Sequence, residues 1–380
     1  ALGIPEELRL FDNDTGKYEL ETAAMFGELY WDVTETVDMT LGLRYTDEEK
    51  SASQRAIYLI FADVPTEDDD GYSDFDGDWQ ETTGKFNVNW HMSEDIMWYG
   101  TLARSYKSGG FNPISATDDL LNPALGGDPS LADFEPEYIN SIEFGVKSRL
   151  LNNTVQANVT AFYYDYEGLQ VAKILNQTAL NENVDSEIYG MEGEFLWAPT
   201  ENWRFAANLS YLSTEIGDFE TFDPADPNQR GTTEGITSGG NFNTYTGPEC
   251  PTGCPGIDVS VEGNSIPNAP EYSINLQAAY NFGLSNGMHV DMAIMYYWQD
   301  EFYARIFNTV NDTMASWDVW NANAVLTSAN DDWYGEIYVR NIQDEDHRTG
   351  QFLQDSASGL YTNYQLLEPR TYGVTLGYRF

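Results

Sequence analysis

Apolar and polar residues alternate along much of this chain with a period of two. The last stretch shows it best: Tyr372, Val374, Leu376, Tyr378 and Phe380 are apolar or aromatic, and the residues between them are small or polar. Neighbouring side chains of a β-strand point to opposite faces, so this pattern predicts a strand with one apolar face and one polar face. A chain that ends on such a strand suits a closed barrel whose apolar face meets lipid.

The same alternation predicts twelve further strands, in six pairs that are joined by short turns. The pairs are 17–31 with 37–48, 79–90 with 96–107, 138–150 with 154–167, 186–198 with 203–218, 271–282 with 288–303, and 316–328 with 333–341. Asn, Gly, Pro and Asp at the bends are typical of hairpin turns. The other connections are long and cover residues 49–78, 108–137, 168–185, 219–270, 304–315 and 342–368. Short turns on one side and long loops on the other are typical of outer-membrane barrels.

Alternation also assigns the two faces of each predicted strand. Ile142, Phe144 and Tyr163 are expected to face lipid, whereas Glu143 and Lys147 are expected to face the interior. A charged side chain on the lipid face at mid-bilayer costs about 2–4 kcal/mol, so this register is strongly set. The sequence therefore predicts an all-β, antiparallel, up-and-down transmembrane barrel of about thirteen strands.

Tryptophan and tyrosine support a membrane interface. Aromatic residues make up 14% of the chain, and amphipathic rings collect where a membrane meets water. Six tryptophans lie close to short turns: Trp31, Trp90, Trp98, Trp197, Trp203 and Trp333. Soluble propellers and lectins are also rich in aromatic residues, but they have no reason to place tryptophan at one end of their hairpins.

The formal net charge of −44 excludes a nucleic-acid partner, which would need a basic surface. Cys250 and Cys254 enclose Pro, Thr and Gly, a tight loop that we expect to close as a disulfide in an oxidising compartment. Two cysteines far in sequence from the three histidines are too few for a zinc site.

Thirteen strands are an odd number, whereas bacterial single-chain barrels have an even number. The last strand must run toward the periplasm, which places residues 1–16 in an extracellular loop. We therefore expect residues 1–380 to be the C-terminal portion of a larger barrel, without its N-terminal strands.

Several segments resemble the TonB-dependent receptors of the outer membrane, especially the ferric-siderophore type. Residues 98–112 end in K-S-G-G-F-N, as does one strand-to-loop segment of that family. Residues 135–147, 161–170, 268–270 and 370–380 resemble further family segments in the expected order. Each match alone is weak, but their common order along the chain is specific.

This resemblance implies a 22-stranded barrel that is plugged by an N-terminal domain. The chain would supply roughly the tenth to the twenty-second strand, while the plug and the first strands are absent. The TonB–ExbB–ExbD complex would act through that absent plug. The ligand implied is an iron–siderophore complex, and the surroundings are outer-membrane lipid and lipopolysaccharide.

Arg104, Tyr106, Lys107 and Phe111 lie at the end of a predicted strand, where an incoming ligand would first be caught. Cations and aromatic rings suit an iron chelate through charge and stacking. The alternative is that these side chains anchor the loop or form part of an interface girdle. Interior charges such as Glu143, Lys147, Arg149, Glu192, Glu194 and Arg340 would either contact the plug or pair across strands, and we favour pairing.

Asp74, Asp76 and Asp78 stand at the end of an acidic run with glycines, which partly resembles a Ca²⁺ loop. The bidentate Glu that ends an EF-hand-type loop is missing. The alternatives are a solvated acidic loop, or weak Mg²⁺ or Ca²⁺ bridging to lipopolysaccharide.

The sequence shows no catalytic motif, so we expect no enzyme. The leading hypothesis is a TonB-coupled importer of a scarce, large ligand in the outer membrane of a Gram-negative bacterium. The alternatives are a passive porin of about fourteen strands, an adhesive surface protein and a soluble lectin-like protein.

Overall fold

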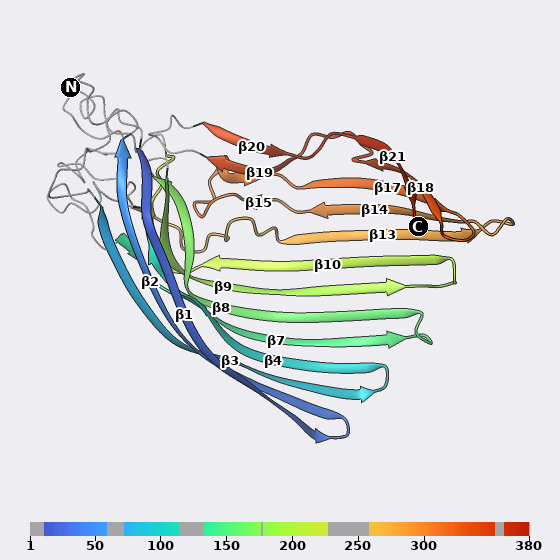
Figure 1. The fold of residues 1–380 in the computed structure, drawn as a ribbon, viewed down its shortest axis with the longest axis horizontal. Coiled ribbons are helices and arrows are strands. Elements are labelled where there is room, and N and C mark those ends of the chain that lie inside the picture. The colour runs from blue at the N-terminus through green and yellow to red at the C-terminus, as the bar shows by residue number, and fades with distance from the viewer. Residues whose placement is uncertain are drawn as a thin grey trace.

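The computed structural model describes residues 11–58, 72–113, 132–175, 178–226, 258–353 and 361–379, and its main feature is a thirteen-stranded antiparallel sheet (Figure 1). Its strands, in spatial order, are β1 (Phe11–Thr34), β2 (Val37–Tyr58), β3 (Ser73–Ser93), β4 (Ile96–Lys107), β7 (Glu137–Leu150), β8 (Val155–Leu175), β9 (Thr178–Trp197), β10 (Trp203–Ile216), β13 (Tyr272–Gly283), β14 (His289–Gln299), β17 (Trp317–Thr327), β18 (Trp333–Arg340) and β21 (Thr371–Tyr378). Strands that follow one another in sequence among these thirteen also lie side by side in the sheet. This up-and-down order and the number of strands confirm the prediction.

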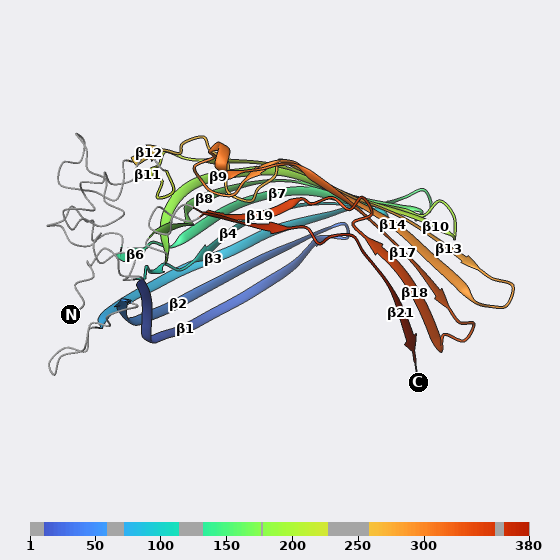
Figure 2. The ribbon, with the colours of Figure 1, turned by 90° about the horizontal axis from the view of Figure 1, so that it is seen from above.

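The sheet is an open arch rather than a closed barrel (Figure 2). Strands β1 and β21 form its two edges, and in the described part they do not pair with each other. Closure as part of a 22-stranded barrel stays a prediction. No helix in the described ranges is long and apolar enough to cross a membrane.

Short turns join the hairpins at one end of the sheet. Three consecutive residues of the β7–β8 turn, Leu151, Asn152 and Asn153, have positive φ angles of 52°, 54° and 65°. Asn adopts this left-handed conformation more readily than most residues, which explains its place in the turn. Gly287 and Asp331 have φ angles of 83° and 59° in two further turns at this end.

Several strands are longer than the alternation predicted. Strand β1 has 24 residues and β8 has 21, whereas about 9–11 residues suffice to cross a bilayer. The predicted loop at 168–185 was therefore wrong, because β8 and β9 continue through most of it, and β1 already begins within the predicted loop 1–16. Outside the membrane both faces of a strand meet water, so cross-strand hydrogen bonds continue while the hydrophobic alternation fades.

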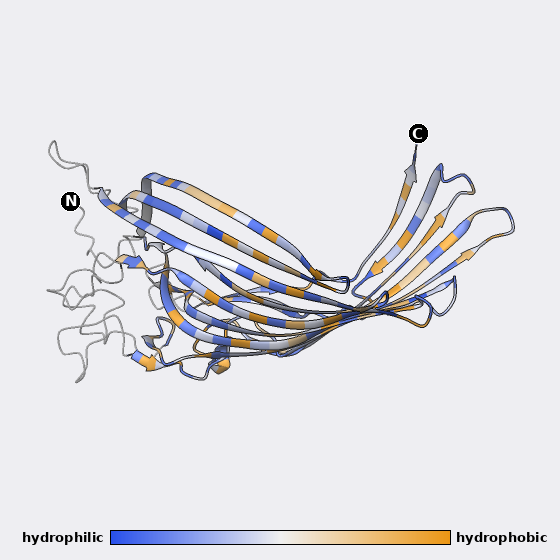
Figure 3. Ribbon diagram, turned by 90° about the horizontal axis from the view of Figure 1, so that it is seen from below, coloured by the Kyte–Doolittle hydropathy of each residue, from blue (hydrophilic) through white to orange (hydrophobic). Residues whose placement is uncertain are grey.

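Hydrophilic and hydrophobic residues alternate along many of the strands (Figure 3), so the two faces of the sheet differ as predicted. One face, called the apolar face here, carries Ile142 and Phe144, which are 54% and 56% exposed. The opposite face, called the polar face, carries Glu143, whose carboxylate accepts a 2.9 Å hydrogen bond from the Tyr164 hydroxyl. The exposed apolar side chains along the thirteen strands form a belt on the first face, as the contact of a barrel with lipid requires.

The tryptophans near the short turns are at least partly exposed, and Trp98, Trp197 and Trp203 pack on neighbouring rings. The Trp98 ring stacks on Phe144 with centroids 5.4 Å apart, and the Trp203 ring lies 4.6 Å from that of Tyr280. Trp31, at the edge of the sheet, is 61% exposed. Rings gathered near one end of the sheet agree with the predicted interface girdle.

Small two-stranded sheets form within the long connections at the other end of the sheet, which we call the loop end. They are β5 (Gly110–Phe111) with β6 (Asp133–Phe134), β11 (Glu220–Phe222) with β12 (Asp258–Ser260), β15 (Phe302–Tyr303) with β16 (Thr313–Met314), and β19 (Arg348–Leu353) with β20 (Thr362–Leu366). A short 3₁₀ helix, η5 (Val310–Asp312), precedes β16. The loop end of the sheet is thus built, in its described part, from folded segments.

Candidate functional site

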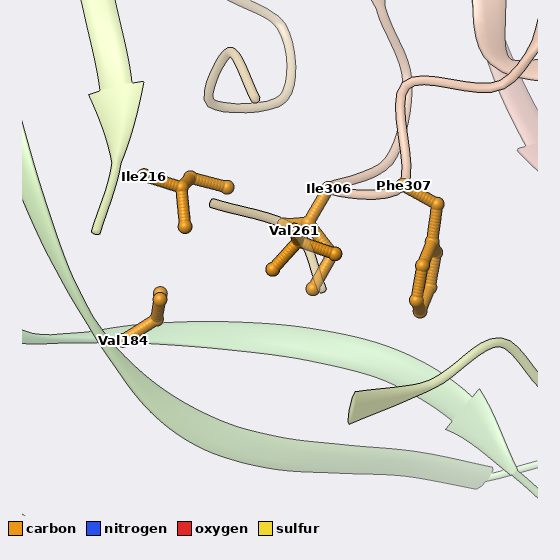
Figure 4. Close-up of a cluster of buried hydrophobic side chains, with 5 residues drawn as sticks. All are labelled: Val184, Ile216, Val261, Ile306 and Phe307. Carbon is orange, nitrogen blue, oxygen red and sulfur yellow. The ribbon is translucent and has the colours of Figure 1, made fainter. Parts of the chain in front are cut away.

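The long connections at the loop end share a hydrophobic cluster of their own. Val184 of β9, Ile216 at the end of β10, Val261, Ile306 and Phe307 are all buried and form what we call the loop core (Figure 4). These residues come from three separate parts of the chain. The loop core therefore joins the β8–β9 extension to the β10–β13 and β14–β17 connections.

Asparagine side chains hold the same connections together through backbone groups. The Asn264 amide donates a 2.8 Å hydrogen bond to the carbonyl of Ile306. The side-chain oxygen of Asn308 accepts a 2.7 Å hydrogen bond from the backbone N–H of Ser265. The side-chain amide of Asn308 donates to the backbone carbonyl of Ser265 at 3.0 Å. These hydrogen bonds join the β10–β13 connection to the β14–β17 connection.

Arg305 links the β10–β13 and β14–β17 connections by charge. Its Nη1 and Nη2 donate to the two carboxylate oxygens of Asp223 at 2.6 and 3.2 Å, and its Nε donates to Asp312 at 2.6 Å. The Asp312 side chain is fully buried and also accepts from the backbone and hydroxyl of Thr309. Although burial alone would lower the pKa of the Arg305 guanidinium, the two carboxylates raise it. The cation therefore stays charged.

Lys173 forms a second buried ion pair near the tip of the β8–β9 hairpin. Its Nζ lies 2.9 Å from Glu182, donates to Thr221 at 2.6 Å and sits 3.7 Å from the centre of the Phe222 ring. Eighteen residues separate Lys173 from the start of β8, which puts it well outside a bilayer. Burial lowers the pKa of the Lys173 ammonium, and Glu182 opposes that shift. This pair attaches β11 to the hairpin.

Sequence reasoning missed these two ion pairs. A signal was present, because the chain has only 18 Lys and Arg against 62 Asp and Glu. A cation inside an acidic loop is surrounded by potential partners, so Lys173 and Arg305 deserved to be singled out. Glu182 and Asp312 lie nine and seven residues from these cations, within reach of a search along the sequence, whereas Asp223 lies 82 residues from Arg305 and could not be named.

The segment after β4, one of those that resemble the family, is bonded to strands β2 and β3 of the sheet. The Lys50 ammonium donates to the Ser108 hydroxyl and to the Gly109 carbonyl, both at 2.7 Å. Ser108 in turn donates to Glu48, and Lys50 lies 5.1 Å from the centre of the Trp79 ring. All of these partners come from β2 and β3.

Phe111 continues this anchor. Its ring lies 5.6 Å from that of Phe75 and 6.5 Å from that of Trp79. Gly109 approaches the chain so closely that a Cβ atom would meet the carbonyl oxygen of Phe134 at 2.3 Å. Together these contacts support loop anchoring, which was the alternative interpretation of Phe111.

The structure does not bring the four predicted ligand residues to one point. Arg104 pairs in register with Asn140, as the neighbouring Leu102 pairs with Ile142, so Arg104 lies on the apolar face. Its Nη1 donates to the Asn140 side chain at 2.7 Å, and its guanidinium lies 4.7 Å from the centre of the Tyr138 ring. Because Arg104 lies on the lipid side of the sheet, its position does not favour contact with a ligand in the barrel interior.

Tyr106 and Lys107 are differently placed. The Tyr106 hydroxyl is buried, has no hydrogen-bond partner among the described residues, and lies near the charges of Glu48 and Glu81. The Lys107 side chain is 63% exposed, and its ammonium lies 3.8 Å from Glu137. The ligand-binding role of all four candidates stays a prediction.

Asp74, Asp76 and Asp78 lie on strand β3, not in a loop as predicted. They are exposed and stand at alternate positions, so they share one face of an extended segment. Within the described ranges, no three His, Cys, Asp or Glu side chains are close enough to hold a metal ion. Calcium binding stays a prediction, and Cys250 and Cys254 lie outside the described residues.

The predicted pairing of interior charges across strands is wrong where the structure describes them. Glu143 accepts from Tyr164, Glu194 accepts from Asn158 at 3.3 Å, and Lys147 lies 5.4 Å from the centre of the Tyr99 ring. In the described part, no ion pair joins the six charges that the sequence singled out, which leaves their formal charge uncompensated on the polar face.

A family model described as "TonB dependent receptor-like, beta-barrel" matches residues 4–377. The chain belongs to this family. TonB-dependent receptors are transport receptors of the Gram-negative outer membrane, and this chain is part of their barrel wall. The apolar belt and the long connections at one end are explained by that setting.

Among curated relatives, the chain is similar to the pesticin receptors of Yersinia enterocolitica and Yersinia pestis. The first is 22% identical over 207 residues, or 54% of this chain and 28% of the relative. The second is 23% identical over 208 residues, with the same shares of 54% and 28%. The match thus covers about half of this chain and less than a third of the length of these receptors.

Two solved structures share its fold. The ferric yersiniabactin uptake receptor FyuA of Yersinia pestis has a TM-score of 0.66 and 16% identity, covering 94% of this chain and 45% of that one. The siderophore receptor PiuA of Acinetobacter baumannii has a TM-score of 0.61 and 18% identity, covering 94% and 43%. At such identities the likeness concerns the fold alone.

Proposed function

We propose that this chain is the C-terminal barrel part of an importer that takes up an iron–siderophore complex with TonB-coupled energy. The observation that carries the proposal is the family match, which runs through the whole thirteen-stranded sheet. The names of the ferric yersiniabactin uptake receptor FyuA and the siderophore receptor PiuA support an iron–siderophore complex over other large ligands. Under this proposal the plug and the strands that complete a 22-stranded barrel are supplied from outside this chain.

The polar face supports a plugged barrel. Lys147, Glu143 and Glu194 contact tyrosine or asparagine instead of opposite charges. A charge without an ionic partner favours a water-filled interior or a second surface that brings the opposite charge. We propose that the plug is this second surface and that the TonB–ExbB–ExbD complex acts through it.

The ligand would enter past the loop core and the anchored segment after β4. Of the four candidates, Lys107 is the one whose side chain is well exposed, whereas the Tyr106 hydroxyl is buried. An exposed ammonium suits the oxygen-rich surface of an iron chelate. Phe111 supports this contact from the anchor by fixing the segment that follows β4.

Uptake of a ⁵⁵Fe-labelled siderophore tests this proposal. The strain is grown with too little iron, and uptake is compared between wild type, a deletion of the gene and a deletion of tonB. We expect both deletions to abolish energy-dependent uptake of the cognate siderophore. Equal uptake in all three strains, over a panel of siderophores, contradicts the proposal.

Conductance measurements distinguish this proposal from the alternative, a passive channel of about fourteen strands. A plugged receptor holds its pore closed, so the full-length protein in a planar bilayer should show no steady conductance, whereas a porin should conduct continuously. A steady open pore in the full-length protein favours the porin.

A further inference from the structure

Two hollows meet on the polar face between β10 and β21. The larger, of about 520 Å³, reaches from Thr200 in the β9–β10 turn to Asn323 of β17. The smaller, of about 370 Å³, continues from Asn323 to Arg340, the last residue of β18. Because Asn323 lines both, the two hollows form one trough, which we call the wall trough. It extends from the short-turn end of the sheet to the loop end of β18.

The register places the wall trough in the barrel interior. Glu194 pairs with Asn208 of β10, and Asn208 pairs with Asn275 of β13, so this row continues the polar face into β13. Ala279, which lines the larger hollow, lies four positions after Asn275 and therefore points to the same face.

Small side chains form the floor of the trough. Ala279 pairs in register with Ala293 of β14, and Ala293 pairs in turn with Asn323. All three residues line the larger hollow. Two alanines side by side on neighbouring strands leave a recess in a face that elsewhere carries long side chains.

Polar side chains around this floor are not bonded to other residues. Gln277 and Asn281 lie two positions before and after Ala279, and in the described part of the chain neither side chain makes a hydrogen bond. Arg204 pairs in register with Ala279 and forms no ion pair with any described residue. The trough therefore offers free donors and acceptors beside its floor.

Polar side chains of the first strands behave differently. The Tyr99 hydroxyl lies 2.6 Å from that of Thr160, and the Lys85 ammonium lies 2.7 Å from the Glu28 carboxylate. Groups that satisfy each other form a surface on which a second domain can rest without further bonds. Groups without a partner need water or a passing solute in their place. The two halves of the polar face thus suit different contacts.

We propose that the wall trough is the route by which the iron–siderophore complex crosses the barrel once the plug has moved, an inference that rests on the proposed function. Its continuity from one end of the wall to the other fits a passage. Free amides replace the hydration of the ligand's oxygen atoms step by step, and several weak sites in series let a solute move on.

Charged side chains of both signs line the trough: Glu201, Arg204, Asp291, Glu336 and Arg340. The carboxylates repel a highly anionic chelate, and the arginines repel a highly cationic one. The trough therefore selects a chelate with little net charge.

Filling the floor tests the route. The probe is the ⁵⁵Fe-labelled siderophore that wild-type cells take up from the panel. Ala293→Trp places an indole ring in the trough, and we expect the initial rate of uptake to fall at least about tenfold because the ring blocks passage. Binding of the same siderophore to energy-depleted cells, and the amount of receptor in the outer membrane, should stay within about twofold of wild type.

Ala24→Trp is the matched control. Ala24 lies four positions before Glu28, which meets Lys85 on the polar face, so the same ring enters the interior on β1 instead. Uptake should stay within about twofold of wild type, because β1 lies outside the trough.

Equal uptake by Ala293→Trp and wild type, at equal amounts of receptor, overturns the route and leaves the proposed function standing. Equal losses in Ala293→Trp and Ala24→Trp overturn it too, since any bulky interior side chain would then block uptake. If Ala293→Trp does not assemble, Ala279→Gln narrows the same floor and should lower uptake at least about threefold with binding unchanged. No uptake by wild type of any siderophore in the panel overturns the proposed function and the route together.

Discussion

Asn112 and Asn181 form a reciprocal pair of hydrogen bonds across 69 residues of sequence. The Asn112 side chain donates to the Asn181 carbonyl at 2.9 Å and accepts from the Asn181 backbone N–H at 2.8 Å. Asn112 is fully buried. These hydrogen bonds attach the segment after β5 to strand β9 and so fix the start of the connection between β4 and β7.

Replacing Asn112 by Asp should loosen that attachment. The carboxylate still accepts from the Asn181 N–H, but it cannot donate to the Asn181 carbonyl, and a buried carbonyl without a donor costs about 1–3 kcal/mol. We expect faster hydrogen–deuterium exchange in residues 108–113 and 179–183. Asn286→Asp in the exposed β13–β14 turn serves as a control. It should change the free energy of local opening, as measured by hydrogen exchange, by less than about 0.5 kcal/mol. Equal exchange in both variants contradicts the attachment.

Replacing Arg305 by Met should open the loop core locally. The change leaves the carboxylates of Asp223 and Asp312 buried without a cation, which costs about 3–5 kcal/mol. Exchange should rise in residues 219–226 and 302–314 while the thirteen-stranded sheet keeps its protection. Arg348→Met serves as the control, because Arg348 only covers the Tyr364 ring at 4.0 Å and should cost about 1 kcal/mol or less.

The buried Lys173 pair should respond to substitution in a non-additive way. Lys173→Met alone leaves Glu182 and Thr221 buried with a missing partner, and we expect a loss of about 2–4 kcal/mol in the local stability of the β8–β9 tip. Replacing the whole group, by Lys173→Met with Glu182→Leu and Thr221→Val, should restore stability to within about 1 kcal/mol of wild type. If the triple variant is less stable than the single one, the ion pair contributes more than its burial costs.

The apolar belt predicts opposite outcomes at two adjacent residues of β21. Val374 is 70% exposed on the apolar face, whereas Thr375 pairs with Glu336 on the polar face. Val374→Arg should cost about 2–4 kcal/mol at mid-bilayer depth and reduce the yield of assembled protein in the outer membrane. Thr375→Arg gains an opposite charge across the strand and should assemble normally. Assembly is measured by heat-modifiable migration in gels.

The sequence predicted those parts of the fold that the bilayer dictates. Between Val155 and Tyr163 one face must meet hydrocarbon, so the hydrophobic period reports the strand, its register and its faces together. Beyond the membrane that constraint ends. Asp74, Asp76 and Asp78 were therefore assigned to a loop although β3 already includes them.

The site was harder to predict because its contacts are long-range. Phe111 and Arg104 were singled out together from their closeness in sequence, yet one packs into an anchor and the other lies on the lipid side. The side that Arg104 occupies could have been inferred from the sequence, because Arg104 lies two positions after the apolar Leu102 and so shares its face. The partners of Arg305 and Lys173 were only partly available, since Asp312 and Glu182 lie seven and nine residues away in sequence, whereas Asp223 and Thr221 belong to a separate connection.

The loop core has a consequence for how this surface can evolve. Val184, Ile216 and Phe307 hold three connections in place from within, apart from the barrel wall below them. The outward positions of these connections are therefore free to drift in sequence without loss of shape. Substitutions at exposed positions there should therefore be tolerated better than substitutions of Val184, Ile216 or Phe307 in the loop core.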